Sequence, residues 1–271
     1  MGERGVISNS DDLPVTLESL IDDLARLGVR AGMTLLVHSS LSSLGWVCGG
    51  SVTVVYALES AIGSTGTLVM PTHSTDFSDP RNWSDPPVPD HWWPTIRESM
   101  PAYDPELTPT RGMGRIPETF RTQNGVIRSG HPQVSFAARG QSARQITFDH
   151  RLESGFGKGS PLGRVYDLAG WILLLGVGHS CNTSLHLAEY RMGSEKKKTI
   201  RTGAPVLHNG VRRWCEFEDL EWDSSDFTRI GEEFASKSGL VKQGLVGKAK
   251  ASLMPQRELV DFAVRWLETH R

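Results

Sequence analysis

Apolar residues recur along this chain with two different spacings, and segments of the two kinds alternate. Leu17, Leu20, Leu24 and Leu27 lie three or four residues apart, which is typical of one face of an amphipathic helix. Residues 34–38 form a short, continuous apolar run between a glycine and a serine cluster, as in a strand buried on both faces. The pattern predicts helices over 16–27, 51–62, 117–120, 141–146, 161–168, 183–192, 226–237 and 255–270, and strands over 34–38, 66–71, 134–138, 171–176 and 213–218.

Alternation of helices and strands indicates an α/β protein. We expect a three-layer α/β/α sandwich with a largely parallel central sheet. Residues 1–13 are polar and are expected to form a flexible tail, and residues 14–271 a single domain. Ser51 is expected to cap the second helix, and residues 195–201 to form a turn or solvated face.

The alternation stops between residues 72 and 109. This stretch contains Trp83, Trp92 and Trp93 among many Pro and Asp residues, and it shows little periodicity. Long irregular connections within compact domains are often lids or binding loops. We therefore expect an insertion that faces the substrate.

Composition narrows the class of protein. The 271 residues carry a formal net charge of -2 with 22% charged residues, which argues against a general electrostatic grip on nucleic acid. The 3 Cys are far apart and lack C-x-x-C spacing, so neither a disulfide framework nor a Cys-rich zinc site is expected. No apolar run reaches the roughly 18 residues that a membrane span needs, and no signal peptide is apparent. We expect a cytoplasmic protein without membrane or nucleic-acid partners.

Two of the segments that follow strands could bind anions or a carbonyl oxygen. His38-Ser-Ser-Leu-Ser is followed by Gly45 and Gly49-Gly50, which combines hydroxyls with flexible backbone. A polar turn leading into a helix explains this segment equally well. Residues 110–118 place two glycines and two arginines before a helix, where N–H groups favour anions. That segment is neither a Walker A motif nor a G-x-G-x-x-G motif, and alone it is weak evidence.

A third segment, residues 176–189, carries His186 in the first turns of a helix. Such a histidine is more often a surface group, unless a carboxylate orients it as a general base. Glu221 and Asp223 are two acids at i and i+2 that point the same way in an extended chain. The simpler interpretation of this pair is a solvated acidic edge.

Other chemistries remain open from the residues alone. His179, Cys181 and His186 match no familiar metal-ligand spacing, so no metal is expected. Ser180, Cys181 or Cys48 could serve as the nucleophile of a hydrolase.

Five strings, taken together, resemble the aminoglycoside 3-N-acetyltransferase family. They are TLLVHSSL at 34–41, GTLVMPTH at 66–73, RSGHP at 128–132, GFGKGSPL at 155–162 and LLLGVGHSCNTSLHLAE at 173–189. Their order is that of the family, and they span nearly the whole chain. Lys158 departs from the family's acid in that motif, and the insertion with Trp92 and Trp93 has no clear match, which leaves the range of antibiotics open.

The resemblance implies transfer of an acetyl group from acetyl-CoA to the 3-amino group of the 2-deoxystreptamine ring of an aminoglycoside antibiotic, conferring resistance. It implies His186 as general base with Glu221 orienting it, and Asp76, Asp223 and Glu189 at the substrate. The residues that it places along CoA are His38, Ser39, Ser40, Leu41, Thr110, Gly112, Met113, Gly114, Ile116 and Pro117. A monomer or homodimer is expected. The alternatives are another amino sugar as the acceptor, a hydrolase or ping-pong acyltransferase with a Cys or Ser nucleophile, and a non-catalytic module that binds CoA or a sugar in the same pocket.

Physical chemistry is consistent with these implications. A protonated amine cannot attack a thioester, so a base that works near pH 7 suits the reaction. A polycationic sugar should be held by carboxylates, for which the candidates are Asp76, Asp79, Asp85, Glu221, Asp223 and Asp226. Backbone N–H groups of the Ser39-Ser40 turn, or those at a helix N-terminus, could stabilise the oxyanion.

Overall fold

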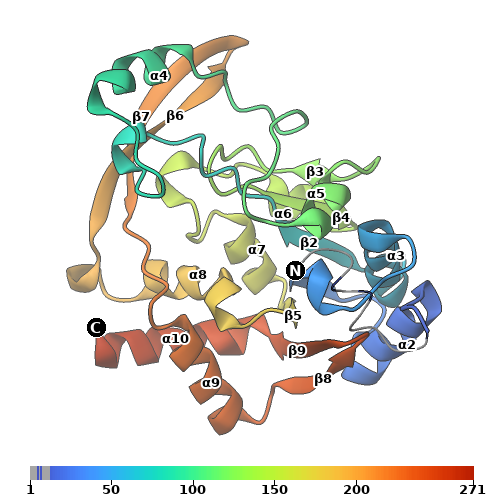
Figure 1. Ribbon diagram of the computed structural model, residues 1–271. Coiled ribbons are helices and arrows are strands. Elements are labelled where there is room, and N and C mark those ends of the chain that lie inside the picture. The colour runs from blue at the N-terminus through green and yellow to red at the C-terminus, as the bar shows by residue number, and fades with distance from the viewer. Residues whose placement is uncertain (1–4, 6, 8–12) are drawn as a thin grey trace.

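The computed structural model describes residues 5, 7 and 13–271 (Figure 1). The expected tail over residues 1–13 lies almost entirely outside the described residues. The described chain forms a seven-stranded sheet in the order β3-β4-β2-β1-β5-β9-β8, together with a separate two-stranded sheet.

The seven-stranded sheet is mixed. Its centre is parallel, since β1 (Thr34–Ser39) pairs with β2 (Thr67–Pro71) on one side and with β5 (Trp171–Leu175) on the other. Both flanks are antiparallel: β4 (Phe136–Gly140) and β3 (Ile127–Arg128) lie beyond β2, and β9 (Ala249–Pro255) and β8 (Lys242–Val246) lie beyond β5. The α/β class is confirmed, but the expectation of a largely parallel sheet is wrong. A two-residue connection at Gly247 and Lys248 joins β8 to β9, and so short a link permits only antiparallel pairing.

Helices cover both faces of this sheet. Alternate strand residues enter different cores, Leu35 and Val37 on one side and Leu36 on the other. The first core is closed by α2 (Leu17–Leu27), α3 (Gly50–Ile62) and α5 (Arg115–Arg121). The second is closed by α6 (Ala143–Thr147), α7 (Pro161–Asp167), α8 (Ser184–Arg191), α9 (Phe227–Ser238) and α10 (Gln256–His270). The layered arrangement leaves the strand ends open, and these ends carry the site.

A second, smaller unit projects from the sheet at the top of Figure 1. It consists of the hairpin of β6 (Thr199–His208) and β7 (Val211–Leu220), with α4 (Trp93–Ser99) packed beside it. Hydrogen bonds join the insertion to this hairpin: the Tyr103 N–H donates to the Pro205 carbonyl at 2.9 Å, and the Arg212 guanidinium donates to the Met100 carbonyl at 3.0 Å. The insertion therefore has a defined position despite its weak sequence pattern.

Several sequence-based boundaries need correction. Residues 199–201, expected in a turn, belong to β6, which pairs with β7 along its whole length. Gly49, not Ser51, caps α3, because Ser51 lies inside the helix and its hydroxyl bonds to that of Thr119 at 2.8 Å. The pattern also missed β3, β8 and β9. In the described part of the chain, no helix is both long and apolar enough to cross a membrane.

Candidate active site

The carboxyl ends of the parallel strands meet around a cavity of about 230 Å³ that we call the His186 cavity. Ligands bind at this edge in most open α/β sheets. His38 and Ser39 reach it from β1, His73 follows β2, and residues 177–186 follow β5. Pro71 at the end of β2, Gly112, Met113, Pro117 and Phe227 complete the lining. Segments that are far apart in sequence thus share one site.

His186 is held by a carboxylate from its own helix. Its Nδ1 lies 2.6 Å from Oε2 of Glu189, one turn further along α8. Because an ionised carboxylate only accepts, Nδ1 must donate, and the lone pair then resides on Nε2. The imidazole side chain is 14% exposed and lines the cavity. An imidazole held in this tautomer can accept a proton at Nε2.

Aromatic rings fix the plane of the imidazole. Phe156 stacks on His186 with ring centroids 4.7 Å apart and an interplanar angle of 8°. Phe227 meets the imidazole edge-on at 4.7 Å, and Trp222 lies at 6.1 Å. These rings limit rotation of the base and reduce its contact with water.

The acid that orients His186 differs from the sequence-based expectation. Glu221 is exposed, and its backbone N–H donates to the Lys198 carbonyl, whereas Glu189 supplies the carboxylate on the ring. Glu189 was expected at the substrate, but it is only 1% exposed and both of its oxygens are engaged within the protein. The i, i+3 spacing on a helix places Glu189 beside His186.

The second oxygen of Glu189 has two partners. Oε1 accepts the backbone N–H of Asp223 at 3.1 Å and Nη1 of Arg271 at 2.6 Å. The Asp223 side chain is 55% exposed, and bonds from Ser225, with Arg271 nearby, hold the pKa of its carboxyl below the usual range. Asp223 is therefore an ionised, partly exposed carboxylate on a residue whose main chain contacts Glu189.

A groove of about 630 Å³ adjoins the His186 cavity, and the two share Ser39, Gly112 and Met113. One wall is the connection from β1 to α3, and the other is the loop leading into α5. The wall residues are Ser39, Ser40, Leu41, Ser42, Gly45, Trp46, Val47, Gly50, Gly112, Met113, Gly114, Arg115 and Ile116. Seven of the ten residues expected at CoA line this groove, and His38 and Pro117 line the His186 cavity.

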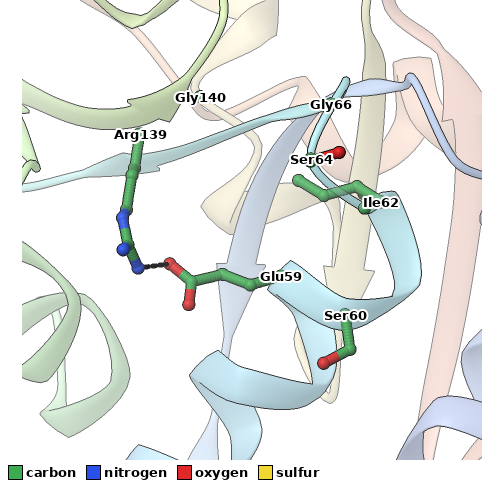
Figure 2. A pocket seen from close by; sticks show the side chains of 8 residues that line it. Glu59, Ser60, Ile62, Ser64, Gly66, Arg139 and Gly140 are labelled. Carbon is green, nitrogen blue, oxygen red and sulfur yellow. Dashed lines mark hydrogen bonds and ion pairs between the residues drawn. The ribbon is translucent and has the colours of Figure 1, made fainter.

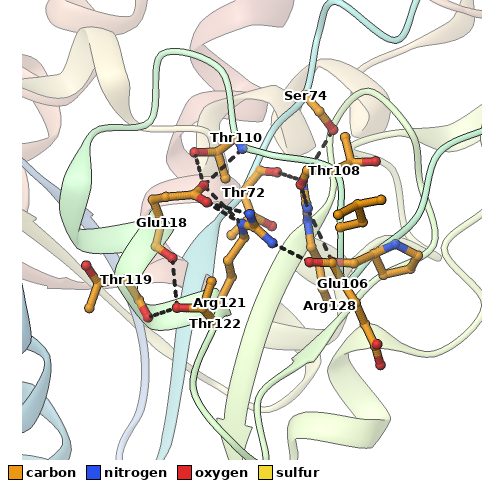
Figure 3. Close-up of polar contacts among 12 residues, drawn as sticks. Thr72, Ser74, Glu106, Thr108, Thr110, Glu118, Thr119, Arg121, Thr122 and Arg128 are labelled. Carbon is orange, nitrogen blue, oxygen red and sulfur yellow. Dashed lines mark hydrogen bonds and ion pairs between the residues drawn. The ribbon is translucent and has the colours of Figure 1, made fainter. Parts of the chain in front are cut away.

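Thr110, the tenth, lines neither hollow. Its N–H and hydroxyl donate to Oε2 of Glu118 at 3.0 and 2.8 Å (Figure 3). Burial would raise the pKa of Glu118, but these bonds and those from Arg121 outweigh it and lower that pKa to about 2. Thr110 thus fastens the loop that forms one wall of the groove.

Arg128 anchors the start of the same loop (Figure 3). Its guanidinium donates to the carbonyls of Thr72 and Thr108 and to the hydroxyl of Ser135. The loop is thereby joined to the segment directly after β2, which also carries His73.

Burial lowers the pKa of His38 and of His73 to about 3, so both rings are neutral in the folded protein.

Carboxylates near the insertion differ in availability. Asp76 and Asp85 line a separate cavity of about 310 Å³ with Trp83 and Arg111, and Oδ1 of Asp76 is buried without a hydrogen-bond partner. Asp79, which was expected to hold a cation, is 4% exposed and paired with Arg97 at 2.7 Å. Asp76 and Asp85 are therefore the acids that can meet a ligand there.

The alternative nucleophiles lack activation. Cys48 and Cys181 are exposed, and within the described chain neither of them nor Ser180 bonds to a histidine or a carboxylate through its side chain. The Ser40 N–H, expected to stabilise an oxyanion, already donates to the Leu175 carbonyl at 2.9 Å. The Ser39 hydroxyl, in contrast, is buried without a partner at the junction of groove and cavity.

A further cavity of about 520 Å³ lies at the other ends of the strands, where β2 begins and the antiparallel β4 ends. Figure 2 shows Glu59 and Arg139 facing each other across it, with an ion-pair distance of 2.8 Å. Gly66, which precedes β2, and Gly140, which ends β4, form its floor. It contains none of the expected site residues.

Comparison with known proteins decides the family. Residues 36–268 match the sequence family described as "Aminoglycoside 3-N-acetyltransferase". The chain belongs to this family. It is 46% identical over 261 residues to the "SPbeta prophage-derived aminoglycoside N(3')-acetyltransferase-like protein YokD" of Bacillus subtilis, covering 96% of this chain and 95% of that protein. The crystal structure of YokD superposes with a TM-score of 0.96, 44% identity and 98% coverage of both chains.

Enzymes of the family are also similar. "Aminoglycoside N(3)-acetyltransferase VII" of Streptomyces paromomycinus is 36% identical over 284 residues, covering 99% of this chain and 96% of that enzyme. The structure described as "AAC-IIIb binary with CoASH" has a TM-score of 0.85 and 31% identity, covering 95% of this chain and 97% of that chain. The chain is accordingly an acetyltransferase of this family, with acetyl-CoA as co-substrate.

Residues missed by sequence reasoning complete the site. Arg271 contacts Glu189 from the other end of the domain, and Phe156 and Phe227 enclose the imidazole. The Gly155-Phe-Gly string entered the sequence reasoning only through the resemblance. No local sequence pattern could predict the role of Arg271, because Glu189, its partner, is 82 residues away in sequence.

Proposed function

We propose that this enzyme transfers the acetyl group of acetyl-CoA directly to the 3-amino group of the 2-deoxystreptamine ring of an aminoglycoside, and so confers resistance. The observation that carries the proposal is the position of the His186–Glu189 pair, beside the junction between the His186 cavity and the groove. A thioester laid along the groove would present its carbonyl to the cavity that contains the base.

The reaction balances with these residues. The ammonium group of the sugar loses one proton to solvent, and Nε2 of His186 takes a second proton from the nitrogen as the amine attacks the thioester carbonyl carbon. A carbon–nitrogen bond forms, and the resulting oxyanion can accept a hydrogen bond from the Ser39 hydroxyl. The carbon–sulfur bond then breaks, and the leaving thiolate takes the proton back from the imidazolium.

The antibiotic would lie on the side of the insertion. Asp76 and Asp223 are partly exposed carboxylates that can pair with its ammonium groups. Trp83 can pack against a sugar face in the cavity that contains Asp76 and Asp85. The groove supplies glycine backbone and Arg115 for the phosphates of CoA.

The experiment is a thiol-release assay with acetyl-CoA and a panel of aminoglycosides and other amino sugars, followed by location of the acetylated nitrogen. We expect His186→Ala to lower turnover by about 10²–10⁴ while CoA binding is retained. Asp76→Asn and Asp223→Asn should weaken antibiotic binding more than CoA binding in calorimetry. Wild-type turnover of His186→Ala would reject the base, and acetylation at another nitrogen would reject the assigned position.

Cys181 offers a matched test of the covalent alternative, because it lines the same cavity. Direct transfer predicts near wild-type turnover for Cys181→Ala and no acyl-enzyme in mass spectrometry of enzyme incubated with acetyl-CoA alone. An acetylated Cys181 that is consumed on addition of antibiotic would establish a ping-pong route.

A further inference from the structure

Arg271, the residue after α10, lies behind the catalytic pair and contacts three parts of the site. Its Nη1 donates to Oε1 of Glu189 at 2.6 Å, and its Nε donates to Oδ2 of Asp226 at 3.0 Å. Its Nη2 donates to the Asp223 carbonyl at 2.6 Å and lies 3.6 Å from Oδ2 of Asp223. One side chain thus joins α8, the segment after β7 and the start of α9.

Glu189 depends on this contact. It is 1% exposed, and an ionised carboxylate at such a position needs charged or hydrogen-bonding partners for both oxygens. His186 occupies Oε2, so Arg271 and the Asp223 N–H are the partners of Oε1. Burial by itself lowers the pKa of Arg271, but the hydrogen bonds to Glu189 and Asp226 raise it by more. The pKa of Arg271 is therefore above its usual value. The guanidinium therefore stays charged at every working pH.

We propose that Arg271 is a positioning residue for proton transfer in this enzyme. It keeps Glu189 ionised and fixed in rotation, so that Glu189 holds His186 in the tautomer and direction that receive the amine proton. Through Asp223 it also sets the distance between the base and a carboxylate expected to meet the substrate cation. This inference rests on the proposed function for its catalytic meaning, and on the contacts of the Arg271 guanidinium for its geometry.

The charge of Arg271 has a consequence with a definite sign. A positive charge behind Glu189 opposes protonation of His186, whereas Glu189 itself favours it. The charged and titratable groups near His186 are Glu189 on α8, Arg271 after α10, His38 and His73 at the ends of β1 and β2, and Asp223 after β7. The strand-end histidines are neutral, since burial lowers their pKa to about 3. Removing Arg271 should therefore ease protonation of His186 and move the acid limb of the rate profile to higher pH.

The experiment compares Arg271→Gln and Arg271→Lys with Arg257→Gln in the full chain. Arg257, near the start of α10, is the control, because its guanidinium donates to the carbonyls of Tyr166 and Asp167 rather than to Glu189. The first readout is NMR titration of the His186 ring signals, assigned with His186→Gln, in enzyme without substrate. The second is the pH dependence of kcat/KM, with thermal unfolding of each variant as the check on folding.

We expect the His186 ring to take up its proton at a higher pH in Arg271→Gln than in wild type, and Arg271→Lys, which keeps the charge, to stay close to wild type. We expect kcat to fall about 10- to 100-fold in Arg271→Gln at neutral pH, with the KM for acetyl-CoA unchanged. Arg257→Gln should match wild type in both readouts. Titration curves and rate profiles that coincide in all three variants would overturn the proposal. If Arg271→Gln does not fold, the test rests on kcat of Arg271→Lys, because a single ammonium cannot bond Glu189, Asp226 and the Asp223 carbonyl at once and kcat should still fall severalfold. A wild-type kcat of Arg271→Lys at every pH would then overturn the proposal. The titration requires no turnover, so it tests Arg271 independently of the reaction. If the His186 midpoint shifts in Arg271→Gln but the enzyme acetylates no aminoglycoside, the proposed function is rejected, and the influence of Arg271 on His186 is still supported.

Discussion

Buried histidines should make this fold sensitive to mild acid. Burial lowers the pKa of His38 and of His73 to about 3, and that of His131 to about 4, from an ordinary value of 6.5. Below pH 6.5 the unfolded chain takes up protons that the folded protein does not bind, so stability falls as the pH falls toward the folded values. Burial lowers the pKa of His150 as well, and it adds to the same trend.

The magnitude follows from linkage. Between pH 7.5 and 5.5 each of the three histidines with a stated pKa removes about 1.4 kcal/mol, which gives a loss of about 4 kcal/mol in the free energy of unfolding. A typical domain has about 5–15 kcal/mol in total, so this loss is large. Burial raises the pKa of Asp219, and this carboxyl acts in the opposite direction as the pH falls.

The assay is urea unfolding at pH 7.5, 6.5 and 5.5, on wild type, His131→Asn and His208→Gln. In His131→Asn the amide oxygen can accept the Gln133 and Val134 N–H groups that Nδ1 accepts in wild type, at 3.2 Å each. The loss between pH 7.5 and 5.5 should be about 1.4 kcal/mol smaller than in wild type, because one buried titrating group is gone. His208 is exposed, and its variant should retain the full loss. Equal losses in wild type and His131→Asn, or a wild-type stability that does not change with pH, would refute the reasoning.

Two further predictions concern the groove and the sheet. Glu118→Gln removes the negative charge that accepts both hydrogen bonds from Thr110 and so holds one wall of the groove in place. We expect the Kd for CoA, measured by calorimetry, to rise about tenfold, with antibiotic binding nearly unchanged. An unaltered affinity for CoA would contradict this prediction. Gly140→Ala should lower the free energy of unfolding by more than about 1 kcal/mol, because the φ of Gly140 is +126° and a Cβ there would lie 2.2 Å from the Gly66 carbonyl oxygen. Gly130→Ala is the control and should change stability little, because a Cβ at Gly130 would meet open space. Equal urea midpoints for the two variants would contradict this prediction.

The secondary structure of the central layer could be predicted because its signals are local. The apolar runs of β1, β2 and β5 and the apolar spacing of α2, α9 and α10 all predicted elements that the structure contains. Strands with exposed faces escape the same reasoning. Four of the five residues of β8 are exposed, and the apolar stretch of β6 contains Gly203 and Pro205, residues that are uncommon in strands, so neither segment reads as a strand. The Asn209-Gly210 turn, with both residues at positive φ, is the local sign of the hairpin, and apolar periodicity does not register it.

In the candidate site, too, features with a local sequence signal were predicted and those that depend on distant residues were not. The sequence pattern predicts the helix that carries His186, and it marks the loops at residues 38–41 and 110–117 as unusual. The partner of the imidazole was assigned to the wrong acid, because Glu189 at i+3 is a local candidate whose orientation depends on which face of α8 is buried. Arg271 could not be found at all, since only the packing of α10 against α8 brings it to Glu189.

The order of apolar and polar residues by itself determined the α/β class and the central strands, since these depend on periodicity and on residues close in sequence, and the resemblance to a family supplied the candidate base. Tertiary structure alone decided the antiparallel flanks of the sheet, the acid that holds His186 and the arginine behind it. Strand direction and long-range charge pairs depend on where the chain returns in space, and burial makes those pairs strong by removing the competing water.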